Sequence, residues 1–237
     1  MKKHLGLAGI VALGLTLAVA APASAATSTI YVPDDFVKSL SDTRATGHYE
    51  LAGTGLHIWT EGSTSTDKVA EYVATNTPLS SVGEPSLEFT GATESGGLPG
   101  FQLYIDANGD GQADGILVGE NSAYGNDWWL SNSAQQFVKD GAPSHTGGFG
   151  STNHGTLAQW RAAFPVTVVT AFGFSLGSAV KGDGVINAID FAGTRYVFGK
   201  QTVLDGKTAC KNDSWTTSTK PVFTNQGDCV SYFTARK

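Results

Sequence analysis

Apolar and polar side chains alternate with a period of two along several short stretches of the chain. Residues 101–105 show this alternation most clearly, and residues 116–118 follow after a polar gap as a short apolar run. Successive side chains of a β-strand point to opposite faces, so this period is that of a strand with one buried face. We therefore expect two strands joined by a tight hairpin over residues 106–115.

Further strands are predicted where apolar stretches of similar length lie between Gly-, Ser- and Thr-rich turns. Residues 68–74 fit either a helical turn or a strand, and their shortness favours the strand. Strands at this spacing are typical of an all-β fold, a jelly-roll-like antiparallel β-sandwich. The further predicted strands are residues 48–51, 56–59, 68–74, 86–90, 135–138, 166–174, 185–191 and 195–198.

One short helix is predicted with clear start and stop signals. Thr156 and Gln159 have the spacing of a capping box, an apolar stripe that includes Trp160 follows, and Pro165 ends the pattern. A weaker helical signal covers residues 33–40, where Pro33 and two acidic residues stand at the start. We assign Trp160 to the core of the sandwich.

The N-terminus has the pattern of a secretory signal peptide. A basic start is followed by an apolar run over residues 5–20 and by the small-residue cleavage site Ala23-Ser24-Ala25. The run is shorter than the roughly 20 residues that span a bilayer, and no later stretch is as apolar. We therefore expect residues 1–25 to be removed and the chain to be secreted and extracellular, with no transmembrane segment.

Charge and composition narrow the possible partners. The chain has 15 Lys and Arg against 21 Asp and Glu, and loss of Lys2 and Lys3 with the signal peptide brings the net charge to −8. An acidic surface disfavours nucleic acid and anionic membranes and suits a cation such as calcium. Few charged residues and 30 glycines are typical of an extracellular all-β protein with many turns.

Two cysteines lie near the C-terminus. Cys210 and Cys229 are the only ones in the chain, and in an oxidising compartment such a pair forms one disulfide. Closing this loop stabilises the fold by about 3 kcal/mol. We expect a β-sandwich domain over residues 26–198 and a disulfide-closed tail, residues 199–237, that holds Trp215.

The hairpin over residues 106–115 carries a candidate metal site. Asp106, Asn108, Asp110 and Asp114 occupy positions 1, 3, 5 and 9, and Gln112 at position 7 offers its backbone carbonyl. Oxygen ligands at this spacing suit a hard cation, so we expect calcium.

Two features of the hairpin bear on the kind of calcium loop. Position 6 is Gly111, where the chain must turn sharply, while position 12 is Leu117 in place of the Glu of an EF-hand. The sequence therefore resembles the D-x-N-x-D-G-x-x-D calcium loops of integrin-like and FG-GAP repeats, in which β-strands flank the loop. Those propellers repeat the loop and this chain has it once, so a propeller is not expected. A turn without an ion is the alternative, since the same residues form good turns.

An aromatic cluster after the hairpin is the best indication of a partner. Trp128 and Trp129 would point to opposite faces if they lie on a strand, so one can show its indole to solvent. With Tyr124, Asn126 and Asp127 it would form a platform for a polysaccharide or cell-wall glycan. The alternative is that both indoles are packed. Trp59 we assign to the core.

Other candidate chemistry is weaker. Ser175 lies in a G-x-S-x-G match, but a strand rather than a helix follows it, and no His comes later in the chain. His145 and His154 bracket a Gly-rich loop and suggest a transition-metal site, but no H-E-x-x-H motif or Cys partner accompanies them. No acidic pair has a spacing that predicts glycoside hydrolysis.

The segments WWLSN, GTLAQWRAAFP and GFSLGSAVKGDGVI and the Cys-bracketed tail resemble uncharacterised secreted proteins of actinobacteria. The resemblance implies no activity. We interpret the chain as a secreted calcium-binding module for a carbohydrate or the cell envelope, and an enzyme is not favoured. The alternatives are an extracellular hydrolase whose carboxylates come from separate strands and a purely structural envelope protein. The oligomeric state is open.

Overall fold

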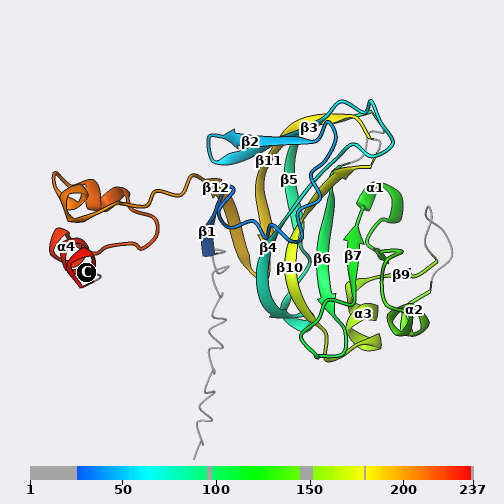
Figure 1. Ribbon diagram of the computed structural model, residues 1–237. Helices are drawn as coiled ribbons and strands as arrows, with labels where there is room; N and C mark the ends of the chain where they lie inside the picture. The colour runs from blue at the N-terminus through cyan, green and yellow to red at the C-terminus, as the bar shows by residue number, and fades with distance from the viewer. Residues whose placement is uncertain (1–25, 95–97, 145–151, 179, 236–237) are drawn as a thin grey trace, which may run out of the picture.

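Two β-sheets pack against each other in the computed structural model, which describes residues 26–94, 98–144, 152–178 and 180–235 (Figure 1). Each sheet contains six strands. The first holds β1 (Ala26–Tyr31), β2 (His48–Ala52), β3 (Gly55–Thr60), β5 (Ser86–Thr93), β11 (Gly182–Phe191) and β12 (Thr194–Gly199). The second holds β4 (Lys68–Pro78), β6 (Gly100–Asp106), β7 (Gly115–Gly119), β8 (Trp128–Leu130), β9 (His154–Gly155) and β10 (Val168–Gly177).

Strand β11 organises the first sheet. It pairs with β5 along one edge, and along the other edge β3 and then β12 follow one another. Strand β2 extends the sheet beyond β3, and β1 lies parallel to β12. All other pairings between the described strands are antiparallel, in the order β4-β10-β6-β7-β8-β9 for the second sheet. The predicted all-β sandwich is therefore confirmed.

The core lies between the two sheets. Phe172 of β10 and Phe191 of β11 stack across the interface with ring centroids 4.2 Å apart. Both rings are almost fully buried, as are Ile58 of β3 and Leu103 of β6. Burying each such side chain stabilises the fold by about 1.5–3 kcal/mol. The period of two in the sequence thus corresponds to one face of each strand that points into this core.

The described residues form four short helices beside the sheets, where the sequence predicts one. The predicted helix is α3 (Leu157–Ala163), and Thr156 and Gln159 form its capping box. The others are α1 (Asn121–Tyr124), α2 (Gln136–Gly141) and α4 (Gln226–Thr234). Three single-turn 3-10 helices are η1 (Leu79–Ser81), η2 (Lys207–Cys210) and η3 (Ser214–Thr217).

Two predicted elements differ in the structure. Residues 135–138 are predicted as a strand but begin helix α2, which buries Val138 and exposes Phe137. Residues 33–40 are predicted as a helix but form turns, because the backbone of Val37 donates to the carbonyl of Tyr72 at 2.8 Å and docks on β4. In both places tertiary packing decides the conformation over local propensity.

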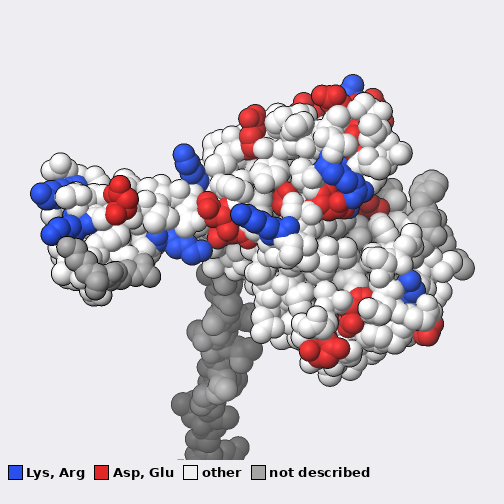
Figure 2. Space-filling view, in the orientation of Figure 1, with Lys and Arg blue, Asp and Glu red and all other residues white. Residues whose placement is uncertain are grey.

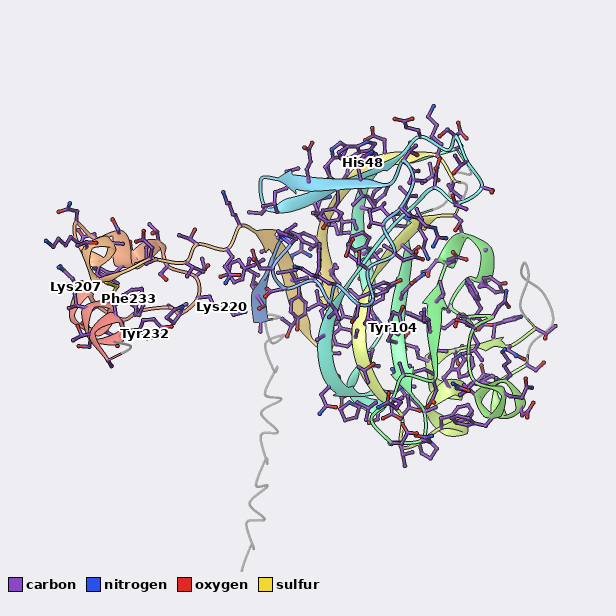
Figure 3. All side chains as sticks on the ribbon, in the orientation of Figure 1. His48, Tyr104, Lys207, Lys220, Tyr232 and Phe233 are labelled. Carbon is purple, nitrogen blue, oxygen red and sulfur yellow. A yellow bond between two sulfur atoms is a disulfide. The ribbon has the colours of Figure 1, made fainter. Side chains whose placement is uncertain are left out.

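The C-terminal segment stands beside the sandwich (Figure 1). A disulfide joins Cys210 and Cys229, as predicted, and both are fully buried in a small cluster around Phe223. Tyr232 and Phe233, both labelled in Figure 3, belong to this cluster. An ion pair between Lys220 Nζ and Asp35 Oδ1, 3.6 Å apart, connects the segment to the sandwich.

Candidate functional sites

The predicted calcium loop connects β6 to β7 as a hairpin. Asp106 lies at its start, and its two carboxylate oxygens accept hydrogen bonds from the backbone amides of Gly109, at 2.7 Å, and Gly111, at 2.8 Å. Gly111 has a φ of 86°, which favours glycine as expected at position 6. Asp114 closes the loop by accepting the backbone amide of Ala107 at 2.8 Å. The loop therefore wraps around the carboxylate of its first residue.

Two of the loop carboxylates are buried without a basic partner. Asp106 is 3% exposed and Asp114 is 6% exposed. Neither forms an ion pair with a Lys, Arg or His of the described chain. A buried carboxylate is costly without a compensating charge, although the amide bonds recover part of this cost. The hydrogen bonds that compensate these two buried carboxylates come from backbone amides of the loop itself.

The remaining loop side chains point elsewhere. Asn108 Nδ2 donates to Asp110 Oδ2 at 3.1 Å, and the backbone amide of Gln112 donates to Asp110 Oδ1 at 2.8 Å. All three residues are exposed. Within the described ranges no three His, Cys, Asp or Glu side chains are grouped so as to hold a metal ion. The buried carboxylates of the loop are thus those of Asp106 and Asp114, and no third acidic or His side chain of the described residues is grouped with them.

The two adjacent tryptophans lie on β8 and point to opposite sides. Trp128 is 5% exposed and packs edge-on against Phe101, with ring centroids 5.8 Å apart. Its carbonyl accepts the indole N–H of Trp160 at 2.9 Å, which ties the strand to helix α3. Trp129 is only half-buried. The strand geometry therefore selects Trp129 as the indole that can meet a ligand.

Neighbouring side chains fix the half-buried indole. Trp129 Nε1 donates to Glu120 Oε2 at 3.0 Å, and the ring of Tyr124 lies nearly parallel to the indole with centroids 6.2 Å apart. Behind Tyr124, the buried His154 places Nδ1 2.9 Å from Asp127 Oδ2. The structure thus brings together Tyr124, Asp127 and Trp129, which we call the Trp129 surface.

Asn126 of the predicted ligand set lies at the exposed turn before β8. Trp128 contacts the core, as described above. Glu120 and His154 were not in the predicted set, because nothing in their local sequence connects them to the tryptophan pair.

A second aromatic surface lies on the first sheet, where the sequence predicts core. Trp59 of β3 is half-buried on the outer side of the sheet, so its assignment to the core is wrong. Its indole stacks on His57, with centroids 4.5 Å apart, and on His48, with centroids 5.1 Å apart. The label in Figure 3 marks His48 at the top of the view, on β2.

His57 connects this stack to two carboxylates. Its Nε2 lies 2.9 Å from Asp183 Oδ1, and its Nδ1 lies 3.2 Å from Glu50 Oε1. Desolvation alone would lower the pKa of His57, but the hydrogen bonds and charges of Asp183 and Glu50 outweigh it and raise the pKa above its ordinary value. Protonation of His57 is therefore favoured in the folded protein.

Ser175 and the pair His145 and His154 are the remaining candidate residues. Ser175 is buried within β10, and the chain continues through Gly177 toward β11 without a helix, which agrees with rejecting a nucleophile elbow. Ser175 lies at a cavity of about 300 Å³ that Glu120 also lines. Of the predicted histidine pair, His154 is described and His145 lies outside the described residues. The predicted signal peptide and its cleavage site, residues 1–25, also lie outside them.

Comparisons with known proteins add no assignment. No family model matches the chain, and no curated protein or solved structure gives a significant match. The resemblance to secreted actinobacterial proteins therefore stays a prediction. The described part of the chain contains no helix long and apolar enough to cross a membrane.

Proposed function

We propose that this protein is exported and binds a polysaccharide or cell-envelope glycan through the Trp129 surface. The observation that carries the proposal is the pair of indoles on β8. One anchors the strand in the core, and the other is half-buried and fixed by a carboxylate. An indole ring held in this way offers a flat face to the C–H groups of a pyranose ring at low entropic cost.

The polar groups around the indole suit the hydroxyl groups of a sugar. Asn126 is exposed and carries an amide that both donates and accepts hydrogen bonds. The carboxylate of Asp127 is fixed by His154 Nδ1 at 2.9 Å. A few oriented polar groups beside an aromatic ring are the usual composition of a small-ligand site. This arrangement supports binding rather than catalysis.

Calcium belongs to the same proposal as a structural ion. Strand β7 leaves the calcium loop at Gly115 and pairs with β8, where Val118 lies opposite Trp129. An ion held at Asp106 and Asp114 would therefore steady the strand next to the binding indole. Residues Asn108, Asp110 and the carbonyl of Gln112 would supply further oxygen ligands, as the spacing of the loop predicts.

Co-sedimentation with insoluble polysaccharides and cell-wall preparations tests the binding proposal. The protein should pellet with at least one of them, and Trp129→Ala should release it into the supernatant. Phe137→Ala is the matched control, because Phe137 is 42% exposed on helix α2 and lies outside the surface. Retention that Trp129→Ala leaves unchanged would refute the proposed site, and no retention on any material would refute the function.

A further inference from the structure

The outer side of the first sheet contains an open hollow beside Trp59. Its volume is about 650 Å³, and Trp59, Glu61, Glu94, Lys181 and Asp183 line it. We call these five residues the Trp59 surface. A volume of this size lies within the range of small-ligand sites in proteins. This surface belongs to the first sheet, whereas Trp129 belongs to the second, so the two are separate.

Strand register explains why the hollow forms. Asp183 of β11 lies opposite Trp59 of β3 on one side and opposite Ala92 of β5 on the other. Side chains directly opposite each other on paired strands lie about 5 Å apart, so these three residues form one row across the sheet. Ala92 is small, and it leaves space beside Asp183 on the outer side of the sheet. The row therefore has the indole on one side, the Asp183 carboxylate in the middle and open space over Ala92 on the other side.

The indole is held in place within this surface. His57 and His48 stack on it, and His57 is itself fixed by Asp183 and Glu50. An aromatic ring that is already immobilised loses little conformational entropy when a ligand contacts it. Such a ring attracts the apolar face of a pyranose, and it also attracts a cation.

The charges around the hollow are predominantly negative. Glu61, Glu94 and Asp183 contribute three carboxylates. Lys181 Nζ lies 4.0 Å from Glu94 Oε1, and His57 beside Trp59 adds a positive charge when it is protonated. The Asp183 side chain is 76% exposed, so it can reach a ligand as well as His57. Acidic side chains gather along the top of the view in Figure 2, over β2 and β3. This field repels anionic ligands and favours a protonated amine.

From this combination we propose that the Trp59 surface binds a saccharide that carries protonated amino groups, such as an oligomer of glucosamine. The indole would contact the ring face, and the carboxylates would pair with the ammonium groups. A basic peptide is less favoured, because β11 is paired on both edges and β3 lies between β11 and β2. The floor of the hollow therefore offers side chains rather than backbone groups, which suits a ring that stacks face-on.

Calorimetric titration of the full-length secreted protein with two matched sugars tests this inference. The probes are the glucosamine tetramer and its N-acetylated form, at mildly acidic pH, where only the first is charged. We expect the glucosamine tetramer to bind at least about tenfold more tightly, with an affinity that falls as salt rises. Equal affinities, or no binding of either sugar, would overturn the proposal.

Variants locate the site and separate it from the Trp129 surface. Trp59→Ala should weaken the glucosamine tetramer about tenfold, and Glu61→Gln and Asp183→Asn should weaken it severalfold. Trp59→Phe keeps an aromatic face and should retain part of the affinity, which excludes a mere folding defect. Trp129→Ala should leave this affinity unchanged even where it abolishes retention on polysaccharide.

Two further results would contradict the assignment. An affinity that Trp59→Ala leaves intact would place the sugar elsewhere. Tetralysine that binds as tightly as the glucosamine tetramer would show that the surface recognises amines on a peptide and not a saccharide.

Discussion

The Trp129 surface and the Trp59 surface present the same side chain in opposite settings. Trp129 belongs to a strand of three residues, next to a second indole that anchors it in the core. Trp59 lies on β3, a strand paired on both edges, among histidines and carboxylates and beside an open hollow. The comparison shows that strand register and neighbouring residues determine whether an indole is exposed to a ligand. The hydrophobicity of the tryptophan side chain does not determine it.

The largest difference should be in stability. Trp128→Ala removes the buried partner of Trp129 and should lower the free energy of unfolding by about 3–5 kcal/mol. Trp59→Ala removes a half-buried ring on the outer side of a sheet and should cost much less. Urea denaturation monitored by circular dichroism measures both. Equal costs would mean that Trp59 is also part of the core.

Calcium should stabilise the sheet that carries Trp129. At a calcium concentration a hundredfold above the dissociation constant, we expect the free energy of unfolding to rise by about 2.7 kcal/mol. Thermal melting with calcium and with a chelator measures the effect, and Asp106→Asn should abolish it. Asp34→Asn, an exposed change outside the loop, is the control. Identical midpoints with and without calcium would exclude a structural ion.

Asp67 should stabilise the loop over residues 61–67, which begins at Glu61 of the Trp59 surface. Its carboxylate accepts hydrogen bonds from the backbone amides of Thr64, at 3.0 Å, and Thr46, at 3.3 Å. Burial alone would raise the pKa of Asp67, but these and the hydroxyl hydrogen bond of Thr64 lower it below the ordinary value. Its stabilising contribution is therefore present at neutral pH and is lost as pH falls through the lowered pKa.

Asp67→Ala should accordingly lower the melting midpoint by several degrees at neutral pH and by progressively less in acid. Differential scanning calorimetry across pH measures this trend. A destabilisation that stays constant down to strongly acidic pH would show that the carboxylate charge is not the cause.

The smallest effect concerns His57. Its raised pKa means that the pairs with Asp183 and Glu50 contribute most below the ordinary pKa of His and fade as pH rises through the raised value. Asp183→Asn should lower the His57 titration midpoint in NMR spectra, while the cost in stability stays below about 1 kcal/mol because the pair is exposed. An unchanged midpoint would mean that Asp183 does not hold the imidazolium.

The sequence predicts the sandwich because most strands have one apolar face, and the capping box of α3 and the disulfide follow from short local signals. It does not predict which side of a strand faces the core when both sides hold large apolar side chains. In residues 56–59, Leu56 and Ile58 share one face and His57 and Trp59 share the other. The polar partner His57 was the signal that could have placed Trp59 outside.

Long-range contacts account for what the local pattern missed. Glu120 and His154 meet the tryptophan pair only after β7, β8 and β9 align, and the spacing of these residues in the chain carries no sign of it. The loop from Asp106 to Asp114 was recognisable because all its oxygen groups lie within a few residues of one another. The spacing of these groups in the sequence does not determine whether their oxygen atoms converge on a bound ion.

The indole N–H signals in a ¹H–¹⁵N NMR spectrum test the central claim most directly. The chain has 5 tryptophans, so each indole gives its own signal once assigned. The ligand is a soluble oligosaccharide derived from the polysaccharide that retains the protein. Its addition should shift the Trp129 indole signal and leave the signals of Trp128 and Trp160 unchanged. A bound oligosaccharide that shifts no Trp129 signal would contradict the account.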